Sequence, residues 1–427
     1  MKRAAPALLA LSLAACVPPA KVQVPPVAPP PGARPEAAPA VRPEFRGVWV
    51  ATVANIDWPS ARGLPSGAQR AEMVAILDRA AALNLNAVVL QVRPSADAIF
   101  PSVFEPWSEF LSGESGRAPD PPWDPLAAWV AEAHRRGLQL HAWFNPFRAR
   151  HSSAKSPIPP GHIARRRPDL VREYGSQLWL DPGEEEVQAH ALDVILDVVA
   201  RYDVDGVHLD DYFYPYPVRD ASGIEVDFPD GASFGRYVAS RGALSRDDWR
   251  RWNVNRFIQR LYGDVHRVRP SVLVGVSPFG IWRPDRPQGV KGFNAYEKLF
   301  ADARTWLERG WVDYLSPQLY WGSWQTEQSF SALLGWWAAQ NPQGRHVWPG
   351  LIASRVGSPE NGWPPSEIVE QIRASRGQSG VTGHLLFSMK ALKNGQGGLG
   401  DLLRRDVYAE RAPVPPSPWL AAPAPAR

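Results

Sequence analysis

The chain has 427 residues, of which 44% are apolar, and 47 Lys and Arg against 43 Asp and Glu give a net charge of +4. This length suits one large domain with insertions, and the scattered basic residues argue against a nucleic-acid partner. The single cysteine excludes an internal disulfide and a thiolate metal site. Tryptophan is frequent, with 19 residues; most are expected in the core, and several could form flat platforms for sugar rings.

Residues 1–15 are predicted to be a signal peptide. Two basic residues precede an apolar run, residues 4–13, that is too short to span a bilayer as a mature helix. The following Leu13-Ala14-Ala15-Cys16 resembles the lipobox of bacterial lipoproteins, in which the cysteine becomes the lipidated first residue. Because Val17 follows Cys16 where an aspartate would favour the inner membrane, we expect an outer-membrane anchor that faces the periplasm. An ordinary signal peptide with an incidental cysteine is the alternative.

Proline- and alanine-rich segments flank the predicted folded domain, residues 43–410. Residues 16–42, which begin with the lipidated Cys16, are expected to form an extended tether between the membrane and this domain. Residues 411–427 share this composition and are expected to be disordered.

Strand-like and helix-like patterns alternate through the domain. The mostly apolar residues 86–93 are typical of a strand that is buried on both faces, and Asp124-Pro125 predicts a helix start. Strands are predicted at residues 46–52, 86–93, 138–145, 206–211, 273–277, 314–320, 347–352 and 383–388. This alternation predicts an α/β fold, a (β/α)8 TIM barrel with loop insertions after strands 2, 4 and 5. The competing doubly wound sheet would place a glycine-rich phosphate turn after its first strand, and residues 52–55 are not one.

The chemistry is predicted to centre on Asp210, at the end of the fourth strand, because active-site residues of such barrels lie at the carboxyl ends of strands. Side chains alternate along a strand, so the apolar Val207 and Leu209 should face the helices. His208 and Asp210 then face the barrel axis, with Asp210 nearest the mouth. A neighbouring Arg93 would keep the Asp210 carboxylate ionised. A buried structural carboxylate is the alternative for Asp210.

Glycoside cleavage usually needs two carboxyl groups, one that protonates the leaving oxygen and one that attacks or activates water. Asp211 and Asp97 are the preferred candidates for the second catalytic group. Asp211 follows Asp210 at the turn, and Asp97 lies in the loop after the second strand. Further loop carboxylates, each more typical of a capping or solvated group, are Asp57, Glu105, Glu109 and Asp285.

Polar and aromatic residues near strand ends are the candidates for substrate binding. Gln318 and Tyr320 suit hydroxyl recognition, and His208 suits an orienting role better than that of a base. The predicted binding residues are Gln91, Arg93, His141, Trp143, Asn145, His208, Tyr212, Gln318, Tyr320 and Trp321. No cofactor or metal is expected, since a metal-dependent deacetylase needs a tight His/Asp cluster. His141 with Asp210 is only a loose candidate for one.

Several motifs follow one another between residues 43 and 403. They are Glu44-Phe45-Arg46-Gly47-Val48-Trp49-Val50-Ala51-Thr52-Val53-Ala54-Asn55-Ile56-Asp57-Trp58-Pro59, Gln91-Val92-Arg93-Pro94, Glu105-Pro106-Trp107-Ser108, His141-Ala142-Trp143-Phe144-Asn145-Pro146, Asp205-Gly206-Val207-His208-Leu209-Asp210-Asp211-Tyr212-Phe213-Tyr214-Pro215 and Ser316-Pro317-Gln318-Leu319-Tyr320-Trp321. In this order they resemble the bacterial glycosyl hydrolase-like family 10.

The resemblance implies a (β/α)8 barrel, export as a lipoprotein and action on a glycan polymer. Peptidoglycan strands, with or without their stem peptides, are the inferred substrate. The likeness extends first to Asp210 and then to Asp211, Gln91, Arg93 and Gln318, but it does not settle the acid/base pair. The expected function is therefore a glycoside hydrolase of the bacterial cell envelope. A non-catalytic glycan-binding lipoprotein and a lytic transglycosylase, which would leave an anhydro-sugar end, are the alternatives.

Overall fold

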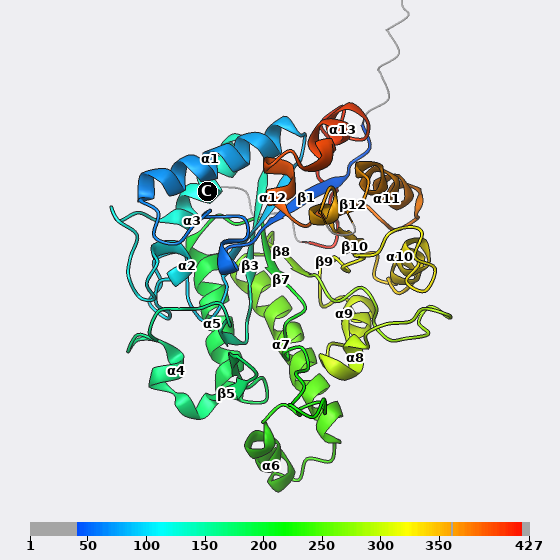
Figure 1. The fold of residues 1–427 in the computed structure, drawn as a ribbon. Helices are drawn as coiled ribbons and strands as arrows, with labels where there is room; N and C mark the ends of the chain where they lie inside the picture. The colour runs from blue at the N-terminus through cyan, green and yellow to red at the C-terminus, as the bar shows by residue number, and fades with distance from the viewer. Residues whose placement is uncertain (1–40, 360–361, 421–427) are drawn as a thin grey trace, which may run out of the picture. The chain divides into compact units, whose positions relative to one another are not determined.

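The computed structural model describes residues 41–359 and 362–420 of the protein (Figure 1). The predicted signal peptide, the lipidation site Cys16 and residues 17–40 of the predicted tether lie outside the described residues. No helix among the described residues combines the length and the apolar character needed to cross a membrane.

A single parallel sheet forms the centre of the domain. Its strands are β1 (Phe45–Val50), β2 (Ala87–Arg93), β3 (Gln139–Phe144), β7 (Gly206–Leu209), β8 (Leu273–Val276), β9 (Tyr314–Leu315), β10 (His346–Val347), β11 (Gly350–Leu351) and β12 (Gly383–Leu386). Their hydrogen-bonded order is β10-β9-β8-β7-β3-β2-β1-β12-β11. Each strand lies beside the next strand of the sheet in chain order, as in a barrel, except that β10 and β11 stand at the two ends of this order and do not pair with each other.

The barrel closes through the residues between β10 and β11, which form one chain crossing interrupted at Trp348-Pro349. On one side the Trp348 backbone N–H donates to the Leu315 carbonyl at 2.9 Å. On the other side the Leu385 backbone N–H donates to the Pro349 carbonyl at 3.0 Å. The crossing therefore pairs with both neighbours and acts as the seventh of eight strands, which confirms the predicted (β/α)8 barrel.

Strand parity follows the predicted pattern. All seven residues of β2 are buried. Val88 and Leu90 belong to the large apolar cluster between the strands and the helices, whereas Val89 belongs to a smaller cluster inside the barrel. Val207 and Leu209 of β7 lie in the outer cluster, so His208 points inward as expected.

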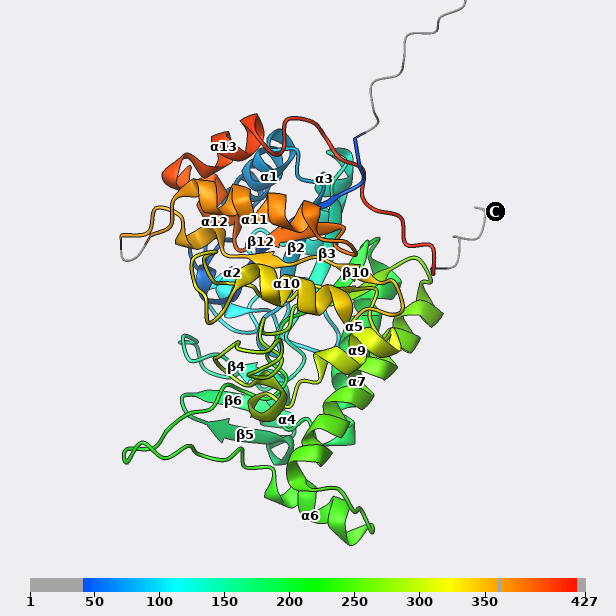
Figure 2. The same cartoon turned by 90° about the vertical axis from the view of Figure 1, so that its right-hand side faces the viewer.

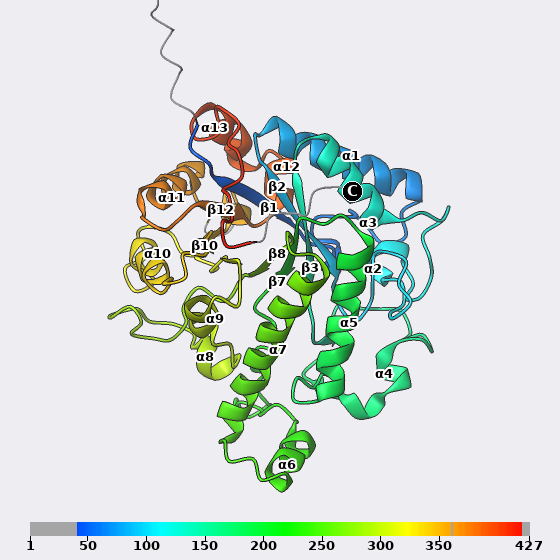
Figure 3. The same ribbon diagram turned by 180° about the vertical axis from the view of Figure 1, so that it is seen from behind.

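Helices cover the outside of the barrel. In α3 the Asp124 carboxylate accepts from the Ala127 backbone N–H at 3.0 Å, Pro125 occupies the first position, and Leu126 and Trp129 are buried. Figure 3 shows α5 beside α7 on the back of the molecule. The covering helices are α1 (Ser66–Ala82), α3 (Pro125–Arg135), α5 (Glu185–Arg201), α7 (Arg246–Val268), α9 (Ala303–Arg309), α10 (Phe330–Ala339), α11 (Pro365–Gly377), α12 (Met389–Lys393) and α13 (Leu399–Arg405).

Insertions follow the second, fourth and fifth strands, as predicted, and carry α2 (Glu109–Ser112), α6 (Gly231–Ala239) and α8 (Ala295–Lys298). A further insertion after the third strand was not predicted. It holds α4 (Ile163–Arg166) and an antiparallel sheet of β4 (Arg148–Arg150), β5 (Val171–Tyr174) and β6 (Gln177–Leu180), in the order β4-β6-β5. Figure 2 shows this sheet on the same side of the barrel as α6.

The prediction of a disordered tail from residue 411 is wrong for residues 411–420. The Pro413 carbonyl accepts from the Glu44 backbone N–H at 2.9 Å, and Trp419 Nε1 donates to Asp313 Oδ1 at 2.7 Å. Val414 and Leu420 pack against the apolar cluster inside the barrel. The Pro- and Ala-rich composition concealed a few anchoring residues. Residues 421–427 lie outside the described part of the chain.

Candidate active site

A cavity of 300 Å³ lies at the carboxyl ends of the barrel strands, where such barrels hold their active sites. Trp49, Gln91 and Trp143 reach it from the first three strands, and Asp210 and Asp211 follow the fourth. Its remaining lining residues are Ala51, Val53, Ile56, Arg148, His151, Tyr212, Tyr216, Ser277, Gln318, Tyr320 and Phe387.

Asp210 is a buried acid that forms no ion pair within 4.0 Å in the described part of the chain. Its Oδ2 accepts from Asn145 Nδ2 at 2.6 Å, and its Oδ1 accepts from the Tyr212 backbone N–H at 3.3 Å. Burial and the neighbouring Asp211 together raise the pKa of Asp210 to about 7, against the Arg148 charge and the Asn145 amide, which lower it. Asp210 therefore carries its proton at pH values below about 7 and a large share of it near pH 7.

Asp211 lies next to Asp210 in the same cavity but has different partners. The Tyr216 hydroxyl donates to Asp211 Oδ2, and the Gln318 side chain also stabilises the ionised form. Burial raises the pKa of Asp211 above its usual value, and these two donors oppose that rise. Two carboxyl groups so close to each other resist being ionised together, so the pair favours one shared proton.

Gln91 and Asn145 orient Asp210 through a short relay. Gln91 Oε1 accepts from the backbone N–H groups of Thr52 and Val53 at 3.0 and 2.9 Å. With its carbonyl end occupied, Gln91 donates from Nε2 to Asn145 Oδ1 at 2.7 Å. The Asn145 amide therefore presents its N–H group to Asp210. The resemblance-based expectation that Gln91 belongs to the site agrees with this position.

Arg93 does not contact Asp210, contrary to our prediction. It is fully buried and pairs with Glu105, with Nη2 and Oε1 2.5 Å apart, so that the pKa of Glu105 falls to about 2 despite its burial. The register between β2 and β3 shifts between Gln91 and Arg93, and this bulge breaks the alternation on which the prediction relied. Arg148 is the cation that acts on Asp210 instead.

Asp97 is not brought to the cavity. Its Oδ1 accepts from the Ser95 backbone N–H at 2.8 Å within its own loop. Burial raises the pKa of Asp97 to about 6, but the side chain does not line the site. Asp211 is therefore the second carboxyl group of the cavity.

His141 and His208 face the barrel axis as predicted, but they lie below the cavity. Both Nδ1 atoms contact the Tyr314 hydroxyl, at 3.0 Å for His141 and 2.9 Å for His208. His208 Nε2 also meets Trp49 Nε1 and Ser277 Oγ, each at 3.1 Å, rather than Asp210. Burial holds the pKa of both histidines well below 6.5, so both are neutral interior residues. The prediction that both side chains face the barrel axis is confirmed. The prediction that they lie at the mouth, in contact with substrate, is wrong.

The predicted binding residues Trp143, Tyr212, Gln318 and Tyr320 line the cavity, whereas Trp321 does not. Trp321 instead packs edge-on against Phe279, with ring centroids 5.6 Å apart. The lining residues that the sequence-based prediction missed include Arg148, His151 and Tyr216. Arg148 and His151 come from the insertion after β3, whose sheet we did not predict. Tyr216 lies two residues after the Asp211-Tyr212-Phe213-Tyr214 motif. Its closeness to the two aspartates in the sequence could have predicted its place in the cavity.

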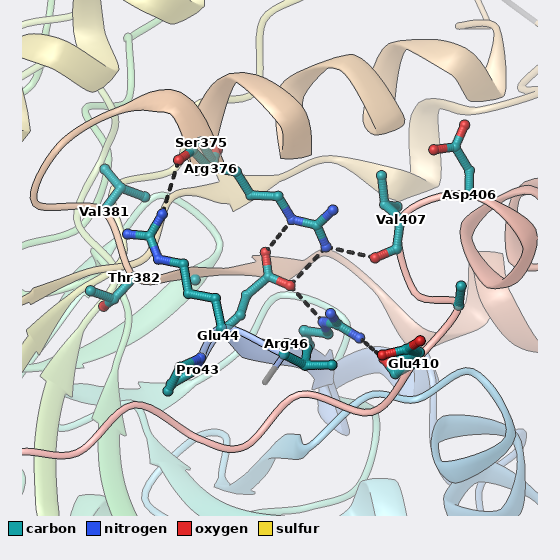
Figure 4. A pocket seen from close by; sticks show the side chains of 14 residues that line it. Pro43, Glu44, Arg46, Ser375, Arg376, Val381, Thr382, Asp406, Val407 and Glu410 are labelled. Carbon is teal, nitrogen blue, oxygen red and sulfur yellow. Dashed lines mark hydrogen bonds and ion pairs between the residues drawn. The ribbon is translucent and has the colours of Figure 1, made fainter. Parts of the chain in front are cut away.

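A second cavity, of 360 Å³, lies at the opposite end of β1 and β12 (Figure 4). Glu44 stands at its centre between two arginines, with Arg46 Nε 2.6 Å and Arg376 Nε 2.7 Å from its carboxylate oxygens. Hydrogen bonding from Arg376 and the charges around it lower the pKa of Glu44 to about 2 against the effect of burial. The charge of Glu44 is thus neutralised by arginines of the protein itself. We therefore interpret this cavity as a structural feature of the barrel base.

Within residues 41–359 and 362–420, no group of three or more His, Cys, Asp and Glu side chains is arranged to hold a metal ion. The chemistry available in the mouth cavity is that of its two carboxyl groups, with amide and hydroxyl donors around them. Such a pair is able to transfer a proton and to stabilise a developing positive charge.

The closed barrel with paired acids at its mouth places the protein in the class of barrel glycosidase-like proteins. Two solved structures share the fold. The catalytic domain of beta-amylase from Paenibacillus polymyxa aligns with a TM-score of 0.56 at 12% identity, covering 88% of this chain and 100% of that one. The PgaB (BpsB) glycoside hydrolase domain from Bordetella bronchiseptica aligns with a TM-score of 0.54 at 15% identity, covering 86% and 98%.

The chain belongs to the family Glycosyl hydrolase-like 10, which matches residues 44–365. Glycosyl hydrolase YngK from Bacillus subtilis (strain 168) is 39% identical over 387 residues, 88% of this chain and 74% of that protein. Glycosyl hydrolase DigH from Escherichia coli (strain K12) is 33% identical over 411 residues, 89% of this chain and 90% of that protein. Family and fold together support a glycoside hydrolase-like function with a glycan as substrate.

Proposed function

We propose that the protein is a glycoside hydrolase of the bacterial cell envelope that cleaves the glycan strands of peptidoglycan, including strands without stem peptides. The observation that carries this proposal is the acid pair in the mouth cavity, where burial raises the pKa of Asp210 to about 7. A carboxyl group with such a pKa holds a proton at neutral pH and is able to release it during the reaction, as a general acid must.

In this proposal Asp210 donates its proton to the glycosidic oxygen while the bond from that oxygen to the anomeric carbon breaks. The departing sugar leaves as an alcohol, and positive charge develops on the anomeric carbon and the ring oxygen of the other sugar. Ionised Asp211, held by the Tyr216 hydroxyl, stabilises this charge. A water then adds to the anomeric carbon and returns a proton to Asp210, which leaves a reducing end and the starting enzyme.

The rest of the cavity suits a sugar ring. Trp143 and Tyr320 offer aromatic surface for the C–H-rich face of a pyranose, and Gln318 offers an amide for hydroxyl recognition. The Gln318 amide donates to the Ser277 carbonyl at 2.9 Å, which fixes its position at the cavity wall. This combination of flat apolar surface and few fixed polar groups is typical of ligand sites.

The proposed location is the outer membrane, with the protein facing the periplasm and anchored through a lipid on Cys16. The support for this is the signal-peptide pattern of residues 1–15 and the lipobox that ends at Cys16. Val41, where the described domain begins, lines the cavity at the base of the barrel.

Product analysis tests the proposal. Intact peptidoglycan and peptide-free glycan strands are incubated with the purified protein, and the soluble products are identified by mass spectrometry. The proposal predicts fragments with reducing ends, each heavier by one water than the corresponding anhydro product. Anhydro-sugar ends would assign a lytic transglycosylase instead. Strands that bind without any product would assign a glycan-binding lipoprotein, and either result overturns the proposal.

A further inference from the structure

A third cavity, of 270 Å³, is formed by α6 together with the first turn of α5 and the first half of α7. Its wall includes Gln188 from α5, Tyr237 from α6, and Trp252 and Asn253 from α7. It shares no lining residue with the mouth cavity or with the cavity at the base. In Figure 3, α6 lies beside the start of α7, away from the barrel strands.

Two buried carboxamide side chains of this cavity each have one atom without a hydrogen-bond partner. Gln188 is 1% exposed and Asn253 is 3% exposed. Among residues 41–359 and 362–420, Gln188 Oε1 has no donor and Asn253 Nδ2 has no acceptor. The amide nitrogen of Gln188 is occupied, since it donates to the Pro182 carbonyl at 2.9 Å. One free acceptor and one free donor therefore lie in the wall of the same cavity.

The unpaired state of these two amides contrasts with that of Gln91 and Asn145 at the barrel mouth. There, Gln91 Nε2 donates to Asn145 Oδ1 at 2.7 Å. Leaving a buried donor or acceptor unpaired costs free energy, so such atoms are rare in folded proteins. A hydroxyl group would satisfy Gln188 and Asn253 together, because its single oxygen both donates and accepts hydrogen bonds.

Aromatic side chains form another part of the wall. Trp252 is 38% exposed, and its ring centre lies 6.2 Å from that of Tyr237, with the rings inclined by 39°. Trp249 is buried behind them, 6.0 Å from Tyr237. The Arg256 guanidinium covers the indole of Trp252 at 4.6 Å and holds it in place. Exposed aromatic rings beside hydroxyl-binding groups suit the C–H-rich face of a pyranose.

The charges of the cavity wall are paired within the protein. Arg256 Nη2 lies 3.2 Å from Glu185 Oε1, and Arg236 pairs with Glu184. These two cations and two anions are the charged residues of the lining, so the wall carries no net formal charge. A ligand without charge therefore fits this cavity better than an acid or a base.

We propose that this cavity binds a neutral sugar ring of a glycan strand, at a site separate from the mouth of the barrel. The ring packs on Trp252, and one of its hydroxyl groups donates to Gln188 Oε1 and accepts from Asn253 Nδ2. A peptide is a poorer match, because a peptide group divides donor and acceptor between its nitrogen and its oxygen.

The inference goes beyond the proposed function, because this site holds a strand and takes no part in cleaving it. Figure 2 shows α6 on the same side of the barrel as the β4-β6-β5 sheet, whose Arg148 lines the mouth. A strand held at the cavity would stay close to the protein, and its effective concentration at the mouth would rise.

Fluorine NMR of the full chain with 5-fluorotryptophan tests the proposal, because each site then has its own reporter. The resonance missing from Trp252→Phe reports on this cavity, and the one missing from Trp143→Phe reports on the mouth. The probe is the trisaccharide of N-acetylglucosamine, titrated into the Asp210→Asn variant so that no turnover is expected. We expect the Trp252 resonance to shift and to saturate.

Asn253→Ala tests the hydrogen bonds. The Kd measured at Trp252 should rise about tenfold or more, because the sugar hydroxyl loses a buried donor. The thermal midpoint should not fall, since Asn253 Nδ2 has no partner in the described part of the fold. Trp324 is the matched control, an indole that is 56% exposed and lies outside all three cavities, and its resonance should not move.

The two reporters separate this inference from the proposed function. A saturable shift at Trp252 supports the second site even if Trp143 does not respond. A shift at Trp143 alone overturns the second site and leaves the proposed function standing. An unchanged Kd in Asn253→Ala, or a response of Trp252 to a stem tripeptide and none to the trisaccharide, also overturns it.

Discussion

Each end of the barrel buries a carboxyl group, and the pKa values of the two groups shift in opposite directions. Glu44 at the base is 7% exposed and Asp210 at the mouth is 6% exposed. Arg46 and Arg376 surround Glu44 and bring its pKa to about 2. Asp210 has amide donors and forms no ion pair among the described residues, and its pKa rises to about 7 although the charge of Arg148 lowers it. Burial alone therefore does not mark a catalytic acid. The partner decides whether a buried carboxyl is a fixed charge or a proton donor.

The two ends should respond to pH with opposite signs. The pKa of Glu44 is lowered on folding, so its contribution to stability is present above pH 4.5 and is lost as the pH falls toward 2. The pKa of Asp210 is raised on folding, so its contribution is full below pH 3.8 and is lost as the pH rises through about 7. The base is therefore the acid-sensitive end, and the mouth is the alkali-sensitive end.

The largest expected effect is that of Asp210→Asn on turnover. An amide cannot give a proton to the glycosidic oxygen, so kcat on peptide-free strands should fall by about a thousandfold. The thermal midpoint should not fall, because the fold already favours the neutral form. Asp97→Asn is the matched control, a buried acid whose pKa is also raised but which lies outside the cavity. Comparable losses of kcat in the two variants would contradict the assignment of the site to the mouth.

Glu44→Gln should lower the free energy of unfolding and leave kcat unchanged, the reverse of the effect of Asp210→Asn. Removing one partner leaves Arg46 and Arg376 without their shared anion, and breaking a buried pair of this kind costs about 3 kcal/mol. Urea unfolding measures this loss, and kcat at temperatures well below the melt should not change. The half-exposed pair Arg304–Glu308 provides the comparison, since Glu308→Gln should cost only about 0.4 kcal/mol. A loss of kcat in folded Glu44→Gln would mean that the base is not purely structural.

Trp419→Phe tests the anchoring of the tail at the base. The indole N–H donates to the buried carboxylate of Asp313 at 2.7 Å, and a hydrogen bond to a charged group is worth about 2 kcal/mol. The phenylalanine keeps an aromatic ring beside His346, so the lost donor is the main change. We expect the unfolding free energy to fall by that amount with no change in kcat. An unchanged free energy of unfolding would show that the hydrogen bond from Trp419 to Asp313 does not stabilise the base.

The smallest expected effect is a change in the alkaline limb of the pH profile. Asn145 donates to Asp210 and lowers its pKa, so Asn145→Ala should move that limb upward by about half a pH unit. Measuring kcat/KM from pH 5 to pH 9 in wild type and variant gives the shift. A limb that moves downward would contradict the contact between Asn145 and Asp210.

The barrel was predictable because its strands are buried on both faces and therefore appear in the sequence as apolar runs. The sheet after β3 was not, because β5 is short and mostly only partly buried, with just Tyr174 buried, so its sequence shows no alternation. The prediction of a disordered tail was wrong for residues 411–420 for a related reason. Its composition predicts disorder on average, whereas a single residue, Trp419, reaches a buried acid that is distant in the sequence.

The acid pair was predictable from local geometry, since parity along β7 and the rule of strand ends both operate within a few residues. The partners of the pair were not, because they depend on the path of the insertions. Arg148 reaches the cavity from a sheet that we did not predict, and a bulge turns Arg93 toward Glu105. Side chains fixed by long-range folding determine the electrostatics of this site, and a single sequence carries no direct signal for them.

The most direct test of the contrast between the two ends is the pH dependence of wild-type kcat/KM on peptide-free strands. The acid pair is the part of the cavity expected to titrate near neutrality, with the pKa of Asp210 raised to about 7 and that of Asp211 raised by burial. Burial lowers the pKa of His151 to about 4 and raises the pKa values of Tyr212, Tyr216 and Tyr320 above 10. We expect kcat/KM to fall about tenfold per pH unit above a pH near 7, as Asp210 loses its proton. A rate that stays constant up to pH 9 would contradict it.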